Sequence, residues 1–183
     1  MPNLVDYNFI EKMEGFSLKG YVPQSNGTAI GNSGVTIMCG IDLGETTPDA
    51  LSDMGISDNL VDILTPYCGL KQQAAIDYLN DNPLTLTPDQ GNELMTAEFN
   101  ARYTQLSTIF DKYSDTNFGN LTSAQQTVVF SIFFQYGNLP QRTPHFWNAC
   151  TSGNWNQVIS ILKNFGDQYE NRRLAEASLL QNS

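Results

Sequence analysis

Two carboxylates and one hydroxyl in the first quarter of the chain have the types and spacing for acid–base chemistry. Glu14 follows a short stretch with apolar periodicity, and Asp42 follows a β-branched run that also carries Thr36. Hydrolysis of a glycosidic bond needs one acid to protonate the leaving oxygen and a second carboxylate to activate water or stabilise the developing positive charge. We therefore interpret Glu14 and Asp42 as a candidate pair for glycoside hydrolysis, with Thr36 positioning the attacking water.

The neighbours of the two acids predict different roles for them. Glu14 has Ile10 and Met13 nearby, and apolar surroundings disfavour an ionised carboxylate, as suits a general acid. Asp42 has a glycine two residues away on each side, where access to water would keep it ionised as the base. A surface position without any chemistry is the ordinary alternative for a single glutamate.

A short helix is expected to carry Glu14. Residues 5–13 place apolar side chains on one helical face, Asp6 is suited to cap the start, and Gly15 is suited to end the helix. Glu14 therefore lies at or just past a helix end and projects towards the segment that follows.

Strands are expected only in residues 16–44. Alternation at 16–19 and the β-branched run 35–37 predict short antiparallel strands. Glycines that allow tight turns separate them, and these are Gly27, Gly31 and Gly34.

Capping residues, prolines and apolar periodicity predict helices through the rest of the chain. A long amphipathic helix begins at Thr87-Pro88-Asp89-Gln90. A helix that is apolar on all sides begins at Ser123, with Gln126 as its capping partner. Shorter helices are expected at 48–54, 57–64, 70–79, 145–151, 155–165 and 169–180.

Composition excludes several functional classes. Nine Lys and Arg against nineteen Asp and Glu give a formal charge of −10, which argues against nucleic acid and anionic membrane surfaces as partners. The longest apolar run, 128–134, is too short for membrane insertion. One histidine and three cysteines predict no metal site and no disulfide framework, and no cofactor is expected.

Two further patterns leave alternatives open. Cys39 with His145 as its base would make a Cys–His hydrolase, although a small thiol in an apolar strand is more often a packing residue. No Lys or Arg occurs between Lys19 and Lys71, while acids accumulate there. This acidic segment is either a solvated surface or a binding site for a basic partner. Such a partner would be an immunity protein if the enzyme is a toxin.

The order of several motifs resembles the phage-type lysozymes. Glu14-Gly15 is followed by Thr36-Ile37, and the six-residue step to Asp42-Leu43-Gly44 is closer still to the pesticin-like branch of bacteriocin muramidases. Phe134-Gln135-Tyr136-Gly137 is similar to the family's buried helix, and Asn171-Arg172-Arg173 to its C-terminal helix.

The chain also departs from this pattern. No carboxylate lies between Glu14 and Thr36, where phage lysozymes place their second acid, so that role passes to Asp42 as in the pesticin branch. Met38-Cys39 replaces a dipeptide that commonly contains glycine.

The resemblance implies an α+β, mostly α fold with two lobes in one domain over residues 1–183. A small lobe at about 14–60 would hold the active-site hairpin, and a helical lobe would cover about 65–183. It also implies cleavage of the β-1,4 bond between N-acetylmuramic acid and N-acetylglucosamine in peptidoglycan, with inversion. We expect a monomer.

Candidate substrate-binding residues are Tyr21, Gln135 and Arg172. Aromatic faces and amides such as those of Tyr21 and Gln135 suit N-acetyl sugars. The family places an arginine of the last helix near the catalytic acid, which in this chain is Arg172 or Arg173. The alternative for Arg172 is a solvated pair with Glu176, four residues on.

Other functions and settings remain open. A lytic transglycosylase needs one catalytic glutamate and no water-activating aspartate, and a non-catalytic wall-binding module needs neither. The N-terminus lacks the basic region and long apolar core of a secretory signal. We therefore expect synthesis in the cytoplasm and action in the periplasm or on the cell wall, either as an endolysin released through a holin or as a toxin delivered by a secretion system.

Overall fold

The computed structural model describes residues 2–182, and their contacts form two compact units. One unit contains the residues up to 13 together with those from 102 onward, and the other contains residues 14–101. Helices account for 62% of the chain, with small β-hairpins near the N-terminus. This confirms the expected α+β, mostly α, lysozyme-like fold class. The expectation of one domain with lobes at about 14–60 and 65–183 stays a prediction.

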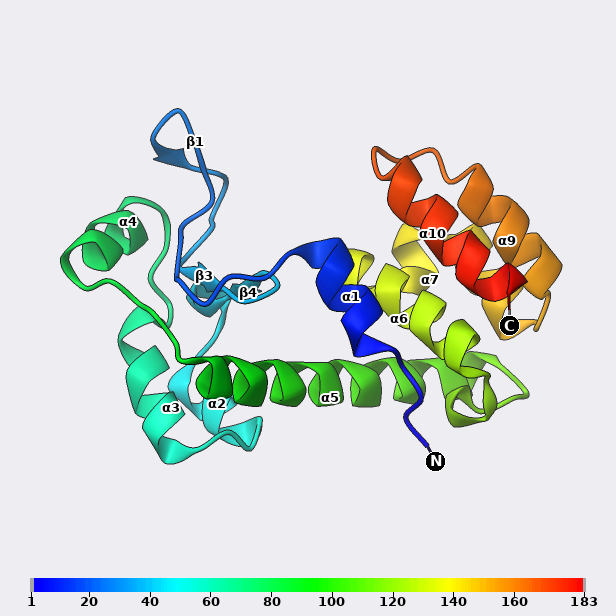
Figure 1. Cartoon of the computed structure of the whole chain (residues 1–183), viewed down its shortest axis with the longest axis horizontal. Coiled ribbons are helices and arrows are strands. Elements are labelled where there is room, and N and C mark those ends of the chain that lie inside the picture. The colour runs from blue at the N-terminus through cyan, green and yellow to red at the C-terminus, as the bar shows by residue number, and fades with distance from the viewer. Residues whose placement is uncertain (1, 183) are drawn as a thin grey trace. The chain divides into compact units, whose positions relative to one another are not determined.

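Helices and strands follow in an order close to the expected one (Figure 1). They are α1 (Tyr7–Glu14), β1 (Gln24–Ser25), β2 (Thr28–Ala29), β3 (Thr36–Ile37), β4 (Ile41–Asp42), the 3₁₀ helix η1 (Leu43–Glu45), α2 (Pro48–Asp53), α3 (Asp58–Leu64), η2 (Thr65–Tyr67), α4 (Gln72–Asp81), α5 (Pro88–Tyr113), η3 (Phe118–Asn120), α6 (Ser123–Tyr136), α7 (Leu139–Arg142), α8 (Pro144–Thr151), α9 (Trp155–Lys163) and α10 (Glu170–Gln181). None of these helices is long and apolar enough to cross a membrane.

Helix α1 has the ends that the sequence predicts. The Asp6 carboxylate accepts a hydrogen bond from the Phe9 N–H at 3.2 Å, as a capping residue does. Gly15 has a φ of +76°, the left-handed conformation that ends helices. Glu14 is therefore the last helical residue.

The strands of the 14–101 unit form two separate hairpins, β1 with β2 and β3 with β4. The β1–β2 turn falls at Asn26-Gly27, which both have positive φ, so the turn expected at Gly27 is confirmed. The strand expected at 16–19 is only partly correct. It does not form a named strand, and within it Lys19 makes an isolated antiparallel bridge opposite Thr85.

Helices α2, α3 and α4 complete the 14–101 unit with the first half of α5, and Figure 1 shows α2 and α3 beside that half. Apolar side chains from several of these segments are fully buried and form the core of this unit. Fully buried members of this core are Val35, Ile37, Leu43, Leu51, Leu60 and Leu64.

In the other unit, α6 is the central buried helix, as its apolar sequence predicts. Every residue from Gln126 to Phe133 is buried. The capping box differs by one residue from the expected one: Thr122 caps the helix and Gln125 bonds back to it. Helix α7 was not among the expected helices. Pro140 lies in its first turn, a position that suits proline.

Candidate active site

Thr36 and Asp42 are direct partners across the β3–β4 hairpin. Residues directly opposite each other in an antiparallel pair project to the same face. The main-chain N–H and C=O of Thr36 hydrogen-bond Tyr21 at 2.6 and 2.9 Å, so the Thr36–Asp42 pair is of the non-hydrogen-bonded kind, in which side chains lie closest. The fold thus brings two of the three predicted catalytic residues together.

The Asp42 carboxylate is held by main-chain N–H groups. Its Oδ1 accepts from the N–H of Gly44 at 2.8 Å and from that of Gly34 at 3.2 Å. Among the residues that the structure describes, the Gly34 N–H is the one donor to its Oδ2, also at 3.2 Å. Since a carboxylate oxygen has two lone pairs, Oδ2 keeps capacity to accept a proton while Oδ1 fixes the group in place.

Two glycines make room for this arrangement. A Cβ atom on Gly34 would lie 2.5 Å from the Gly44 Cα, 2.5 Å from the Leu70 carbonyl oxygen and 2.7 Å from Asp42 Oδ1. A Cβ on Gly44 would lie 2.6 Å from the same Leu70 oxygen. The close approach of the three segments therefore needs glycine at both positions.

Our sequence interpretation of Gly34 was wrong. We expected it to permit a turn, as Gly31 does with a φ of +59°, but Gly34 is absent from the residues with positive φ. Its N–H donates to Asp42, and its lack of a side chain is what the site requires. The symmetric spacing Gly34-x-Thr36 and Asp42-x-Gly44 is the sequence signal that would have indicated this.

Tyr21 extends the row formed by Thr36 and Asp42. It makes an antiparallel bridge to Thr36, so the side chains of Tyr21, Thr36 and Asp42 project to one face of three adjacent segments. The Tyr21 ring is exposed, and Asp42 is half-buried. An exposed aromatic ring beside a carboxylate is a suitable surface for a sugar.

Thr36 is the most covered member of the row. Its side chain is 4% exposed, and its hydroxyl donates to the Gly34 carbonyl at 3.3 Å. A hydroxyl whose proton is already used can still accept a hydrogen bond from a water molecule. Thr36 can therefore orient a water only as an acceptor.

Glu14, the predicted acid, lies at the C-terminal end of α1 and is half-buried. Of the apolar residues near Glu14 in the sequence, Ile10 is fully buried, whereas Phe16 is 48% exposed. The apolar surroundings that the sequence predicts are therefore only partly present.

Met38-Cys39, the dipeptide at which the chain departs from the lysozyme pattern, lies in the turn between β3 and β4. Met38 has a φ of +57°, a conformation that costs most side chains about 1–2 kcal/mol and glycine almost nothing. Its side chain is nevertheless buried beside Gly91 of α5, where an added Cβ would lie 3.0 Å from the Met38 methyl group. Burial of the methionine side chain offsets the backbone strain.

Gln135 and Arg172 belong to the other unit, where both arginines of α10 enter a buried ion cluster with α6. Arg172 bonds Glu176 at 3.2 Å and both Ser131 oxygens at 3.0 Å. Arg173 bonds Glu176 at 2.6 Å and also reaches Gln135. The alternative of a solvated Arg172–Glu176 pair is wrong, because Glu176 is 0% exposed.

Asp167 is the second acid of this cluster. Burial raises its pKa, but hydrogen bonds from Tyr136, the Tyr169 N–H and Arg173, together with the charge of Arg173, outweigh that effect, so the pKa of Asp167 lies below its ordinary value. The cluster therefore holds two cations and two anions.

The cysteines do not have the environment of nucleophiles. Cys39 is 5% exposed. Burial raises the pKa of Cys68 and raises that of Cys150 well above its ordinary value, whereas a reactive cysteine needs a lowered pKa. Within the described residues, no three His, Cys, Asp or Glu side chains gather in a way that could hold a metal ion.

A family model decides the relationship of this chain to known proteins. The model is that of pesticin, described as a bacterial toxin homologue of phage lysozyme (C-terminal part), and it matches residues 4–156. The chain belongs to the pesticin family. A search of curated proteins finds no match.

Membership in the pesticin family confirms the resemblance seen in the motifs. The chain is a phage lysozyme-like domain, and the family implies a toxin that hydrolyses peptidoglycan, with peptidoglycan as substrate. It suggests a glycoside hydrolase as the class of enzyme.

Proposed function

We propose that the protein is a muramidase that hydrolyses the β-1,4 bond between N-acetylmuramic acid and N-acetylglucosamine with inversion. The observation that carries the proposal is the Thr36–Asp42 pair, in which Asp42 is fixed through Oδ1 and keeps Oδ2 available. Membership in a lysozyme-homologue family supports the same chemistry.

Each catalytic residue takes the role that its chemistry supports. Glu14 is the general acid for the leaving oxygen, and Asp42 accepts a proton from the attacking water through Oδ2. Thr36 accepts a hydrogen bond from that water. Inversion requires roughly 6.5–9.5 Å between the two carboxyl groups, which leaves room for the water.

Substrate binding is assigned to Tyr21, Gln135 and Arg172. Tyr21 offers an exposed ring in the same row as Asp42. Gln135 and Arg172 are tied into the buried cluster, which would keep their positions rigid. Removal of the Tyr21 ring by Tyr21→Ala is expected to raise KM more than it lowers kcat.

Glu14→Gln tests the proposal most directly. The amide cannot protonate the leaving group, so we expect release of reducing ends from purified peptidoglycan to fall by a factor of about 10²–10⁴. Glu11→Gln, on the same helix, is the matched control and is expected to keep wild-type turnover. Wild-type activity of a folded Glu14→Gln protein would rule out the assignment.

A lytic transglycosylase is the second candidate, and one observation favours it. Asp42 already acts as the N-cap of η1, so its presence has a structural reason apart from catalysis. Mass spectrometry of the products separates the two reactions, because a transglycosylase leaves anhydro-muramic ends and a hydrolase leaves reducing ends. Absence of any glycan turnover would instead favour a wall-binding module.

The biological setting is also a proposal. We place synthesis in the cytoplasm and action in the periplasm or on the wall, after release through a holin or delivery by a secretion system. The 14–101 unit holds two lysines against twelve acids, which suits a basic immunity protein as partner. A pull-down with the product of the neighbouring gene tests that partner, and no binding would remove it.

A further inference from the structure

One long stretch of the chain carries basic residues and no acidic ones. Residues 116–166 contain no Asp or Glu, although the whole chain contains nineteen. The same stretch contains Arg142 and Lys163, together with His145, the one histidine of the sequence. A surface with one sign of charge attracts ligands of the opposite sign. An anionic ligand is therefore expected to bind here rather than on the 14–101 unit, which holds twelve acids.

A groove of about 460 Å³ lies within this stretch. One side is formed by residues 142–146, at the end of α7 and the start of α8, and the other by residues from the range 160–165, at the end of α9. Since both ranges fall within 116–166, the described lining contains no acid. Pockets that take small organic ligands have volumes of about 300–1,000 Å³. We call this feature the α8–α9 groove.

Apolar side chains make up much of the lining of the α8–α9 groove. Phe146 is 1% exposed, and Ile161 and Phe165 are half-buried. The Phe165 ring lies 6.2 Å from the ring of Phe146 and 5.9 Å from that of Tyr136, and the guanidinium carbon of Arg173 lies 4.6 Å from its centre. These contacts fix the ring, so a ligand that packs on it does not have to order it first.

A cation lies beside this apolar surface. Arg142 is the last residue of α7, lines the groove and is exposed. Within the part of the chain that the structure describes, its guanidinium forms no ion pair with a carboxylate. The planar guanidinium can therefore bind a carboxylate of a ligand through two parallel hydrogen bonds. His145, three residues later, adds an exposed imidazole to the same side of the groove.

We propose that the α8–α9 groove binds a small organic acid that joins an aromatic or branched apolar group to one carboxylate. The apolar group packs on Ile161 and Phe165, and the carboxylate pairs with Arg142. None of the residues that line the groove is assigned to glycan hydrolysis, so this binding site goes beyond the proposed function and does not depend on it.

The direct test is an NMR titration of the whole protein with naphthaleneacetate and with its neutral amide, naphthaleneacetamide, which has nearly the same shape. The wild-type protein is expected to bind the acid about twofold to fivefold more tightly than the amide, as for an exposed ion pair. Arg142→Gln should remove this difference and leave the Kd of the amide unchanged. Lys112→Gln, which removes the same charge from α5 of the same unit, is the matched control and should keep the difference.

A second variant tests the place of binding. Ser160 is an exposed residue of α9 that lines the groove, so the ring introduced by Ser160→Trp should fill the groove and abolish saturable binding of both compounds. Ser178→Trp, at an exposed position of α10, is its control and should bind both as the wild type does. The backbone amide signals that shift should belong to residues 142–146 and 160–165.

Four results would overturn the proposal. They are equal binding of acid and amide by the wild-type protein, a difference that persists in Arg142→Gln, wild-type affinity in a folded Ser160→Trp protein, and shifts that lie outside the two ranges. Acetate and inorganic phosphate, which offer charge without an apolar group, should give no saturable shifts at the same concentrations. Saturation by either of them at these residues would show that the apolar surface takes no part in binding and would also refute the proposal.

Discussion

At the scale of single residues, Asp42 combines two tasks that different substitutions separate. Asp42→Asn keeps an oxygen for the Gly34 and Gly44 N–H groups, so we expect a change in unfolding free energy below about 1 kcal/mol, whereas Asp42→Ala loses the cap and about 1–2 kcal/mol. Both should lose hydrolytic turnover, because neither can accept a proton from water.

The measurements for these variants are urea unfolding and release of reducing ends. Asp49→Asn, on α2, serves as the control for loss of one acid in the same unit. Hydrolysis at the wild-type rate by Asp42→Asn would refute the role of Asp42 as base and leave only its capping role.

Gly34 gives a second prediction at this scale. Gly34→Ala places a Cβ within 2.5 Å of two main-chain atoms and within 2.7 Å of Asp42 Oδ1, so it should destabilise the fold by about 1–3 kcal/mol and displace Asp42. Thermal unfolding and turnover should therefore fall together.

Gly31→Ala is the comparison for Gly34→Ala. That glycine has a positive φ but open space around it, so the substitution should cost only the backbone strain of about 1 kcal/mol and leave turnover unchanged. Equal behaviour of the two alanine variants would show that the close approach at Gly34 is unimportant.

The residue types at the site could be predicted from the sequence, but the contacts that hold these residues in place could not. Glu14, Thr36 and Asp42 were chosen from their types and spacing, whereas the pairing of Thr36 with Asp42 across a hairpin is seen only in the structure. Contacts of Gly34 and Gly44 with Leu70 join segments distant in the sequence, and no local pattern records them. Gly34 was therefore taken for a turn residue.

At the scale of elements, the buried ion cluster connects α6 and α10. Glu176 bonds Ser131, Arg172 and Arg173, and all of these side chains are buried. Glu176→Gln leaves two buried guanidinium groups with one carboxylate fewer, which should cost about 3–5 kcal/mol.

The measurement for Glu176→Gln is the free energy of unfolding in urea. Glu170→Gln changes an exposed acid in the first turn of the same helix and should alter stability by less than about 0.5 kcal/mol. A loss below about 1 kcal/mol in Glu176→Gln would mean that the cluster is not needed to hold α10 on α6.

Helices and strands could be predicted where the signal lies in neighbouring residues of the sequence. Helices with a capping residue and a proline, such as α5 at Thr87-Pro88, begin where expected because the signal is confined to neighbouring residues. The segment at Lys19 pairs with Thr85, sixty-six positions later, so its pairing depends on tertiary contacts and could not be predicted locally. Burial of Glu176 was missed for the same reason.

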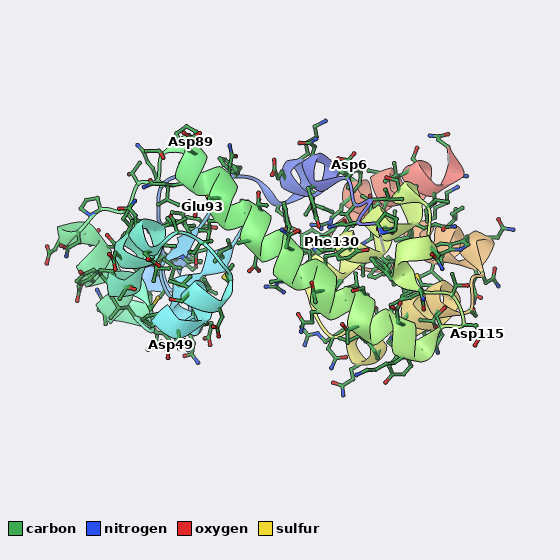
Figure 2. The ribbon with its side chains drawn as sticks, turned by 90° about the horizontal axis from the view of Figure 1, so that it is seen from below. Asp6, Asp49, Asp89, Glu93, Asp115 and Phe130 are labelled. Atoms are coloured by element: carbon green, nitrogen blue, oxygen red, sulfur yellow. The ribbon has the colours of Figure 1, made fainter. Side chains whose placement is uncertain are left out.

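At the scale of the whole molecule, the uneven charge distribution could be counted from the sequence only once the two units were known. The acids of the 14–101 unit are spread over several elements: Figure 2 shows Asp49 and Asp89 at different sides of it, on α2 and α5. The Glu93 carboxylate takes part in hydrogen bonds within the unit, since it accepts from the N–H and the hydroxyl of Ser57. A distributed charge acts at long range, through the field of the whole unit.

This field predicts an unusual salt dependence of wall lysis. At about 10 mM salt the Debye length is about 30 Å and repulsion from the wall dominates, whereas at about 150 mM it falls to about 8 Å and short-range contacts remain. The lysis rate should therefore rise from low salt to a maximum near physiological ionic strength and then decline.

Replacing the exposed acids Asp49, Asp53, Asp58 and Asp62 by Asn should flatten the rise of the lysis rate at low salt, and so should amidation of the wall carboxylates. A rate that falls steadily from the lowest salt would show that attraction outweighs the charge of the 14–101 unit at every distance.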